Sequence, residues 1–424
     1  MFSSLFSMNR RSLLKHTSAL GAGLAISAVH AQEVRDARKL KVAVVALGRG
    51  MGHVQALLQI PNVEIKYLAE VDPVRLDRGL KVVAEKQQVS CVGVKDFRTF
   101  LDDKELDAVF IATPNFWHTP AAVLAMKAGK HVYVEKPGSQ NMQEAELIVE
   151  AAKKYDRVVQ MGNQRRTWLK EPIAMLHEGK IGKVHYARAF YNANRKAIGQ
   201  KANPASPEID MDLWQGPMTA ERDMESYVHY DWHWLWHWGN GELGNNGIHH
   251  LDVLRWGLQV DYPLRVTYNG GRYWYDDKQE TPDTGSAVFD FGNVGMSWEQ
   301  SSCHPRPVEK TGECIFYAEG GSLHTTSAAY TFYDLKGSEI AKGKGKGGDV
   351  EHIGNFLEAI RGNEKLNSPI DEGQKSTLLC HLGNIAYRTG SMVHFDPKTK
   401  KITGNPEAEK YLGRKYRKGW EVGI

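Results

Sequence analysis

Residues 40–53 read Leu-Lys-Val-Ala-Val-Val-Ala-Leu-Gly-Arg-Gly-Met-Gly-His, and this stretch decides the fold. The apolar run after Leu40 is typical of a short buried strand, and Gly48, Gly50 and Gly52 predict a tight turn into a helix. Glycine lets the backbone approach a pyrophosphate, and the free N–H groups of the following helix favour its negative charge. The stretch therefore predicts a strand–turn–helix unit that holds a dinucleotide.

The rest of the first half repeats this alternation of strand and helix. Strand and helix patterns follow one another over the ranges 63–71, 107–112, 119–129, 131–134, 141–154 and 158–161. Strands that alternate with helices predict a parallel sheet wound on both faces. We expect an α/β protein with a Rossmann domain over 40–162, followed by a substrate domain over 163–424.

Asp72 closes the second predicted strand. A carboxylate at that place accepts hydrogen bonds from both hydroxyl groups of an adenosine ribose and repels a 2′-phosphate, which favours NAD over NADP. The alternative is a turn residue before Pro73. The glycine turn itself departs from a clean GxGxxG, because Ala46 stands near the place of the first glycine.

Three further motifs accompany the glycine turn and Asp72. They are Thr113-Pro-Asn115 with His118, Glu135-Lys-Pro137 at a strand end, and Gly241-Glu-Leu-Gly-Asn-Asn-Gly-Ile-His-His-Leu-Asp252. In this combination the chain resembles the Gfo/Idh/MocA oxidoreductase family, and residues 352–391 are similar to the family's C-terminal helical segment. The resemblance implies a C-terminal α+β domain with a large, mostly antiparallel open sheet, and NAD as the cofactor.

The resemblance also implies which residues contact NAD. These are Gly48, Arg49, Gly50, Met51, Asp72, Thr113, Asn115, His118, Glu135, Lys136 and Asn163.

Lys136 and His249 are the predicted catalytic residues. A lysine ammonium stabilises a developing alkoxide or, with its pKa lowered by burial, relays a proton; the alternative is a surface lysine beside Pro137. His249 matches the family's acid/base, and the neighbouring His250 is its rival. Where the family commonly has aspartate, four residues before this histidine, the chain has Asn245, which orients a hydroxyl but does not take its proton.

Substrate contacts are predicted from four more residues. Gln164, Arg165 and Arg166 leave the last strand of the first sheet, and arginine is a fork-shaped donor for substrate oxygens; the alternative for the arginines is a surface pair. Trp236 belongs to a tryptophan-rich run between Tyr227 and Trp238, which suits either a sugar platform or a core cluster. With Lys136, Asn245 and His249 they make up the predicted substrate site.

We expect no metal site. Three histidines recur every fourth residue and would share one helical face, but no carboxylate or supporting pattern accompanies them. They are His229, His233 and His237.

The N-terminus reads as an export signal. Arg10 and Arg11 precede an Ala/Gly-rich apolar stretch and a small-residue cleavage site at 29–31. Basic, apolar and small-residue regions in this order are typical of a secretory signal, and paired arginines point to twin-arginine translocation. We expect residues 1–31 to be a signal peptide and the protein to be periplasmic or otherwise exported.

Composition excludes several classes of protein. With 42% hydrophobic and 25% charged residues the chain is an ordinary globular protein rather than a disordered or membrane-spanning one. The formal charge is only +4 over 424 residues, and the sequence has no long basic run. It therefore does not predict a basic surface that would bind nucleic acid. We expect a small carbohydrate substrate and, from the family resemblance, a homo-oligomer, a dimer or tetramer.

Three functions fit these residues. The first is oxidation of a hydroxyl of a sugar, sugar derivative or glycoside by NAD that is tightly bound and recycled, because an exported enzyme meets no pool of free cofactor. The second is an NAD-dependent glycoside hydrolase or lyase that works through a transient keto-sugar. The third is a non-catalytic sugar-binding or sensor protein, which needs neither Lys136 nor His249.

Overall fold

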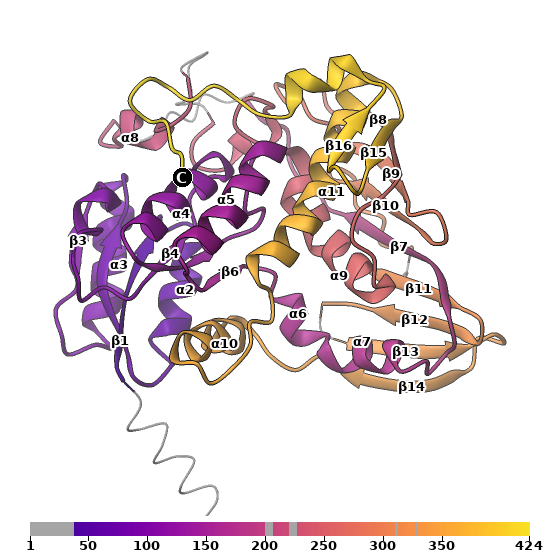
Figure 1. Ribbon diagram of the computed structural model, residues 1–424, viewed down its shortest axis with the longest axis horizontal. Helices are drawn as coiled ribbons and strands as arrows, with labels where there is room; N and C mark the ends of the chain where they lie inside the picture. Colours follow the sequence, from indigo (N-terminus) through magenta and orange to yellow (C-terminus); the bar gives the residue numbers. More distant parts are fainter. Residues whose placement is uncertain (1–37, 200–206, 220–226, 310–312, 328) are drawn as a thin grey trace, which may run out of the picture.

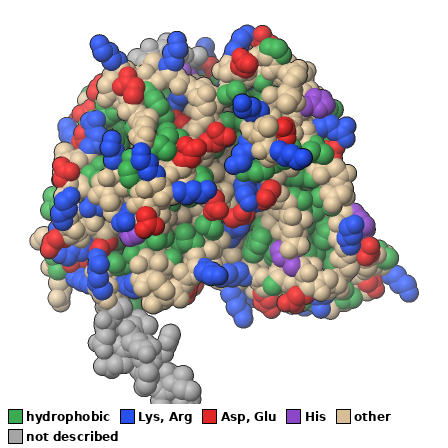
Figure 2. All heavy atoms as spheres, in the orientation of Figure 1, with side chains coloured by type: hydrophobic (Ala, Val, Ile, Leu, Met, Phe, Trp, Pro, Cys, Tyr) green, Lys and Arg blue, Asp and Glu red, His purple; other side chains and the backbone are tan. Residues whose placement is uncertain are grey.

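The computed structural model describes residues 38–199, 207–219, 227–309, 313–327 and 329–424, and Figure 1 shows an α/β domain beside a large second sheet. The predicted signal peptide lies outside the described residues. None of the described helices is both long and apolar enough to cross a membrane. On the face drawn in Figure 2, basic and acidic side chains are interspersed.

The first domain is built on a six-stranded parallel sheet in the order β3-β2-β1-β4-β5-β6. This order is that of a Rossmann fold, so the predicted fold class is confirmed. Its strands are β1 (Leu40–Val45), β2 (Val63–Ala69), β3 (Val92–Val94), β4 (Ala108–Ile111), β5 (His131–Val134) and β6 (Val159–Met161). Its helices are α2 (Gly50–Leu57), α3 (Pro73–Ala84), α4 (Asn115–Lys127) and α5 (Met142–Lys154), with a 3₁₀ turn at Phe97–Phe100.

Helix α4 begins at Asn115, earlier than the predicted 119, although Pro120 lies inside it. Proline lacks the N–H that would bond the carbonyl four residues earlier, here Phe116. Arg414 Nη2 donates to that carbonyl instead, at 2.5 Å. A distant side chain thus supplies the missing bond, which a local pattern does not reveal.

The second domain is a ten-stranded sheet in the order β14-β13-β12-β11-β7-β10-β9-β8-β15-β16, antiparallel except between β7 and β10. The predicted mostly antiparallel sheet is therefore confirmed. Its strands are β7 (Val184–Asn192), β8 (Arg265–Gly271), β9 (Thr284–Asp290), β10 (Gly295–Ser301), β11 (Cys314–Ala318), β12 (Gly321–Thr325), β13 (Ala329–Asp334), β14 (Glu339–Lys344), β15 (Val393–Asp396) and β16 (Lys401–Thr403). Its helices are α6 (Arg165–Trp168), α7 (Lys170–His177), α8 (Met211–Gln215), α9 (Ile248–Leu258), α10 (Asp349–Arg361) and α11 (Ile370–Thr389), with short turns at Asp231–Trp234, Leu243–Gly247 and Pro406–Tyr411.

Helix α10 returns to the first domain. Ile353, Phe356 and Leu357 are fully buried in the same cluster as the apolar side chains of β1 and α2. Figure 1 shows α10 below the first domain, near α2. A domain boundary at residue 163 would assign α10 to the second domain, although α10 packs against the first. Arg49 and Asp349, which are 300 residues apart in sequence, form a hydrogen bond there.

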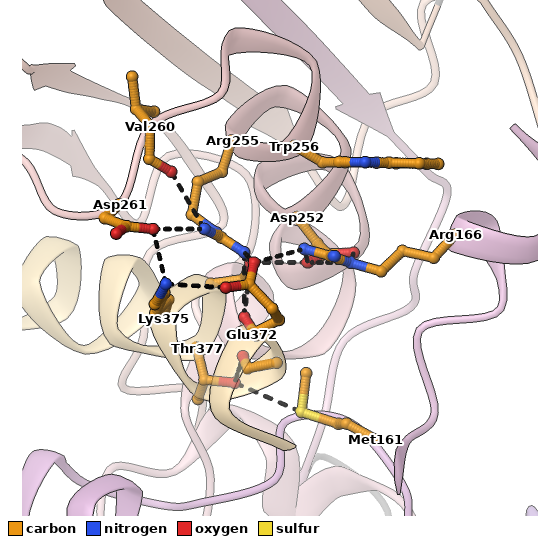
Figure 3. Close-up of polar contacts among 12 residues, drawn as sticks. Met161, Arg166, Asp252, Arg255, Trp256, Val260, Asp261, Glu372, Lys375 and Thr377 are labelled. Carbon is orange, nitrogen blue, oxygen red and sulfur yellow. Dashed lines mark hydrogen bonds and ion pairs between the residues drawn. The ribbon is translucent and has the colours of Figure 1, made fainter. Parts of the chain in front are cut away.

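Helix α9 is held by buried ion pairs (Figure 3). Its Asp252, 1% exposed, accepts from Arg166 of α6 through Nε at 2.9 Å and Nη2 at 2.9 Å. Its Arg255 reaches Glu372 of α11 at 2.5 Å, and Glu372 pairs with Lys375 at 2.8 Å. The network ties α9 to α6, which follows the first sheet, and to α11.

Replacing Asp252 should destabilise the protein strongly. Asp252→Ala leaves the buried Arg166 guanidinium with only the more distant Glu372, at 3.7 Å, and removal of one partner of a buried pair typically costs about 3–5 kcal/mol of unfolding free energy. The matched control is Asp261→Ala, whose carboxylate also pairs with Arg255 and Lys375 but is 60% exposed. Exposed pairs contribute roughly 0–1 kcal/mol. Chemical denaturation measures both, and equal losses would contradict the anchoring role.

Candidate functional site

A cavity of about 390 Å³ opens at the carboxyl ends of β1, β2, β4 and β5. Open α/β sheets bind ligands at this edge. Its opposite wall comes from the run 227–238, hereafter the aromatic segment. Among the predicted site residues, those that line it are Gly48, Arg49, Thr113, Asn115, His118, Glu135, Lys136 and Asn245.

The turn after β1 takes the shape of a glycine turn without a glycine at its start. Ala46 has φ of 67°, in the left-handed region that glycine favours, and its N–H bonds to Ala69. Glu70 fixes the turn: its buried carboxyl accepts from the Leu47 N–H at 2.6 Å and from the Asp72 N–H at 3.1 Å. Sequence reasoning missed Glu70, although it stands two residues before Asp72 at the end of β2.

Glu135 lies beneath this turn as a buried carboxylate. It accepts from His53 Nε2 at 2.9 Å and from Arg49 Nε at 3.1 Å. Burial alone would raise the pKa of Glu135, but the His53 hydrogen bond and the Arg49 charge outweigh it and hold the pKa well below its usual range. Arg49 also binds Asp349 of α10 at 2.7 Å, so the turn is fixed from two sides.

Lys136 meets the second domain at Asn245. Its Nζ donates to the main-chain oxygen of Asn245 at 2.7 Å and to the side-chain oxygen at 3.2 Å. Asn245 lies in the π-helical turn Leu243–Gly247, a geometry that recurs at functional sites. Burial lowers the pKa of Lys136, while the charges of Glu135 and Glu242 oppose the shift. An amine with a lowered pKa is therefore held at the cavity wall.

The two adjacent histidines have different surroundings. His250 is 3% exposed and accepts from Trp298 Nε1 at 3.2 Å, which makes it a packed core residue. His249 lies one helical turn after Asn245, and burial with the nearby charge of Lys136 lowers its pKa well below the usual value. A neutral imidazole is able to accept a proton.

Glu242 is a further titratable group that sequence reasoning missed. It is 2% exposed, and its carboxyl accepts from Asn246 Nδ2 and from Trp234 Nε1 at 3.4 Å. Burial raises the pKa of Glu242. Glu242 belongs to the motif from Gly241 to Asp252 and precedes Asn245 by three residues. Because residues 243–247 form a π-helical turn, ordinary helical spacing does not predict which way the Glu242 side chain points.

The aromatic segment lines the cavity on the side where β2 ends, and there it contacts Asp72. His229 Nε2 lies 3.0 Å from Asp72 Oδ2, and Asp72 Oδ1 caps α3 by accepting from the Val74 N–H. His233 stacks on Trp232 with ring centres 3.7 Å apart. The segment forms only a 3₁₀ turn, so its three histidines do not share a helical face, and no metal-binding cluster occurs among the described residues.

Several predicted substrate residues lie elsewhere. The guanidinium of Arg166 is committed to Asp252, so a structural role replaces its predicted substrate contact. Trp236 lines a different pocket, beside Arg388. Arg165 pairs with Glu313 at 2.8 Å, and Gln164 is buried beside Tyr133.

Four predicted NAD contacts are not part of the cavity wall as it stands: Gly50, Met51, Asp72 and Asn163. Each belongs to the framework just behind it. A Cβ on Gly50 would come within 3.0 Å of Val44 Cγ1, and Met51 and Asn163 are buried.

The lining fits NAD. The glycine turn and the first turns of α2 and α4 offer backbone N–H groups for phosphates. Asp72, next to Val71 of the wall, carries the carboxylate that suits a ribose, and His229 lies 3.0 Å from it. Thr113 Oγ1, in the wall, is buried and has no hydrogen-bond partner among the described residues. An unsatisfied buried hydroxyl is costly, and a bound ligand would satisfy it.

Comparison with known proteins places the chain among oxidoreductases. Residues 20–163 match the Gfo/Idh/MocA family description "Oxidoreductase family, NAD-binding Rossmann fold", and residues 345–422 match its "C-terminal alpha/beta domain". Together the two matches cover just over half of the chain.

Among curated proteins, a "Glycosyl hydrolase family 109 protein" of Saccharopolyspora erythraea is 28% identical over 208 residues, 43% of this chain and 45% of that protein. The "Uncharacterized oxidoreductase YrbE" of Bacillus subtilis is 29% identical over 193 residues, 45% of this chain and 52% of that protein. The chain thus spans about half the length of the curated relatives it matches.

Two solved structures share the fold over most of both chains. The WlbA dehydrogenase of Bordetella pertussis, in complex with NADH and UDP-GlcNAcA, has a TM-score of 0.64 at 19% identity, covering 85% of this chain and 99% of that one. An aldose-aldose oxidoreductase of Caulobacter crescentus has a TM-score of 0.65 at 17% identity, covering 84% of this chain and 100% of that one.

Asn245→Asp should raise the pKa of Lys136. A carboxylate in place of the amide puts a negative charge at the Nζ that the side chain already contacts, which stabilises the ammonium and raises its pKa by about 1–3. NMR titration of the ¹³C-methylated protein, with Lys136→Arg to assign the resonance, measures the change. Asn245→Ala keeps the main-chain acceptor and adds no charge, so equal titrations of the two variants would contradict the argument.

Proposed function

Because the chain belongs to the Gfo/Idh/MocA oxidoreductase family, we propose that it oxidises a hydroxyl of a sugar, sugar derivative or glycoside with NAD as hydride acceptor. The observation that carries the proposal is the Lys136–Asn245 contact: an amine with a lowered pKa, from the NAD-binding domain, is held at the cavity wall by the second domain. A domain that merely bound sugar would not need a buried base at this place.

Each residue has a defined task in this proposal. NAD, when bound, accepts the hydride from the carbon that carries the hydroxyl. Lys136 takes the hydroxyl proton, and Asn245 orients the amine through two oxygens. Glu135 remains ionised and stabilises the ammonium that results. Because the oxidation releases a single proton, His249, one helical turn after Asn245, is the alternative base to Lys136, although it does not line the cavity.

The proposal includes tight retention and recycling of NAD. The aromatic segment crosses the cavity wall opposite the glycine turn, and its His229 reaches Asp72. This supports a cofactor held between two domains. Export through Arg10 and Arg11 makes retention necessary, since a cofactor that left the enzyme would not be replaced outside the cytoplasm.

A second candidate function, cleavage of a glycoside, begins with the same oxidation of a hydroxyl group. Oxidation of one hydroxyl to a ketone acidifies the neighbouring C–H; loss of that proton to a base then expels the glycosidic group, water adds, and the hydride returns to carbon. The relatives named as glycosyl hydrolases and the replacement of the family aspartate by Asn245 favour this alternative.

We also propose a homo-oligomer, a dimer or tetramer. The solvent face of the large sheet exposes apolar side chains, including Val288 at 42% and Tyr317 at 38%. A second copy of the chain would cover them, and light scattering measures the assembly.

Product analysis without added cofactor separates the functions. Mass spectrometry after incubation with mixed sugars and glycosides should show a keto-sugar or lactone with a matching reduced partner. Cleaved glycoside without net redox change would establish the hydrolase or lyase instead. Lys136→Met should lower either rate at least about 100-fold, because general base catalysis typically contributes 10²–10⁴.

The NAD content of that variant is the control, since it reports whether the site is still formed. Turnover that requires added NAD would contradict retention. No product under either condition, with sugar binding intact, would establish the binding protein.

Replacing the arginine pair should abolish export. Arg10→Lys with Arg11→Lys preserves charge but removes the paired arginines that the translocation route reads. Fractionation of cells that express the full chain should then find the protein in the cytoplasm, and unchanged export would contradict the proposed route. Lys15→Arg, in the same basic region, is the matched control and should leave export unchanged.

A further inference from the structure

A second pocket, of about 790 Å³, shares no lining residue with the NAD cavity. It lies among the residues that precede α5, the α11 helix, the aromatic segment and the chain around Tyr411. Nothing in the proposed reaction uses it, although Trp236 of the tryptophan-rich run belongs to its wall.

Arg388 is the central cation of this pocket. Its guanidinium lies between two aromatic rings, 5.0 Å from the centre of Trp236 and 3.9 Å from that of Tyr411. Among the described residues no carboxylate forms an ion pair with Arg388, although the charge of Glu280, which also lines the pocket, acts on its guanidinium. The guanidinium also donates a hydrogen bond to the Tyr411 side chain. The remaining N–H groups of its planar fork match a carboxylate.

Two buried amides add a donor and an acceptor. Gln140, 9% exposed, donates through Nε2 to the His237 carbonyl, while its Oε1 has no partner among the described residues. Asn141, 8% exposed, caps α5 through Oδ1, and its Nδ2 is likewise without a partner. Both side chains line the pocket, and buried polar groups of this kind require a partner.

The charges of the lining leave a positive excess. Lys410 pairs with Glu407, and Arg414 pairs with Glu144. Among the lining residues that the structure describes, Arg388 and Lys415 are then opposed by one carboxylate, Glu280, whose Oε2 accepts from the Trp236 N–H at 2.8 Å. Two cations against one anion favour a ligand with a single negative charge.

We propose that this pocket binds a saccharide that carries one carboxylate. Arg388 pairs with the carboxylate, the Trp236 ring packs against the apolar face of the sugar, and Gln140 and Asn141 bond to hydroxyl groups. The site is separate from the NAD chemistry, so its affinity is measurable without turnover and does not depend on the proposed reaction.

Calorimetry with methyl β-D-glucuronide and its neutral match, methyl β-D-glucoside, tests the site on the full protein. The glucuronide should bind at least 10-fold more tightly than the glucoside. Arg388→Gln should remove that preference, because the charge-assisted pair is lost. Lys410→Gln, a lining cation already paired with Glu407, should leave it unchanged.

Asn141→Asp keeps the helix cap and nearly the same shape, replaces a donor by a carboxylate, and should weaken glucuronide binding at least 10-fold. This variant tests the site even where Arg388→Gln fails to fold. Binding that survives in Lys136→Met supports a separate site, and its loss there would assign the ligand to the NAD cavity instead. Equal affinity for the two glycosides, or tighter binding of glucose 6-phosphate, would overturn the proposal.

Discussion

The buried pair between Asp252 and Arg166 fixes where helix α9 lies. Arg166 follows β6, the last strand of the first sheet, and Asp252 stands one turn after His249. Both ions are almost inaccessible to water, so neither tolerates loss of the other. The pair therefore holds the second domain's motif against the sheet edge that carries Lys136, and the contact with Asn245 depends on that placement.

The fold and the ligand edge of the first sheet were predictable because they follow from periodicity and from the rule that parallel strands end together. The roles of adjacent residues were not. Arg165 and Arg166 are indistinguishable in sequence, yet one pairs with Glu313 and the other with Asp252, partners that lie far away along the chain. Only tertiary packing decides which side of a short helix each occupies.

The aromatic segment is a second case in which the sequence did not predict the role of each residue. A spacing of four predicts one helical face, but the segment is a 3₁₀ turn with other turns on both sides. These turns bring His229 to Asp72 and Trp236 to the second pocket. Most of its tryptophans are core residues, as Trp234 and Trp238 are almost fully buried. The segment thus forms walls of two pockets while packing between the domains.

Asn245 has a consequence for any reaction in which NAD is both reduced and reoxidised. A residue that takes a proton in one half of such a cycle and returns it in the other works best with a pKa near the working pH. Burial lowers the pKa of Lys136 toward that range, and the charges of Glu135 and Glu242 limit the fall. An aspartate in contact with the amine would hold it as an ammonium, so the amide in this chain keeps both directions of proton transfer open.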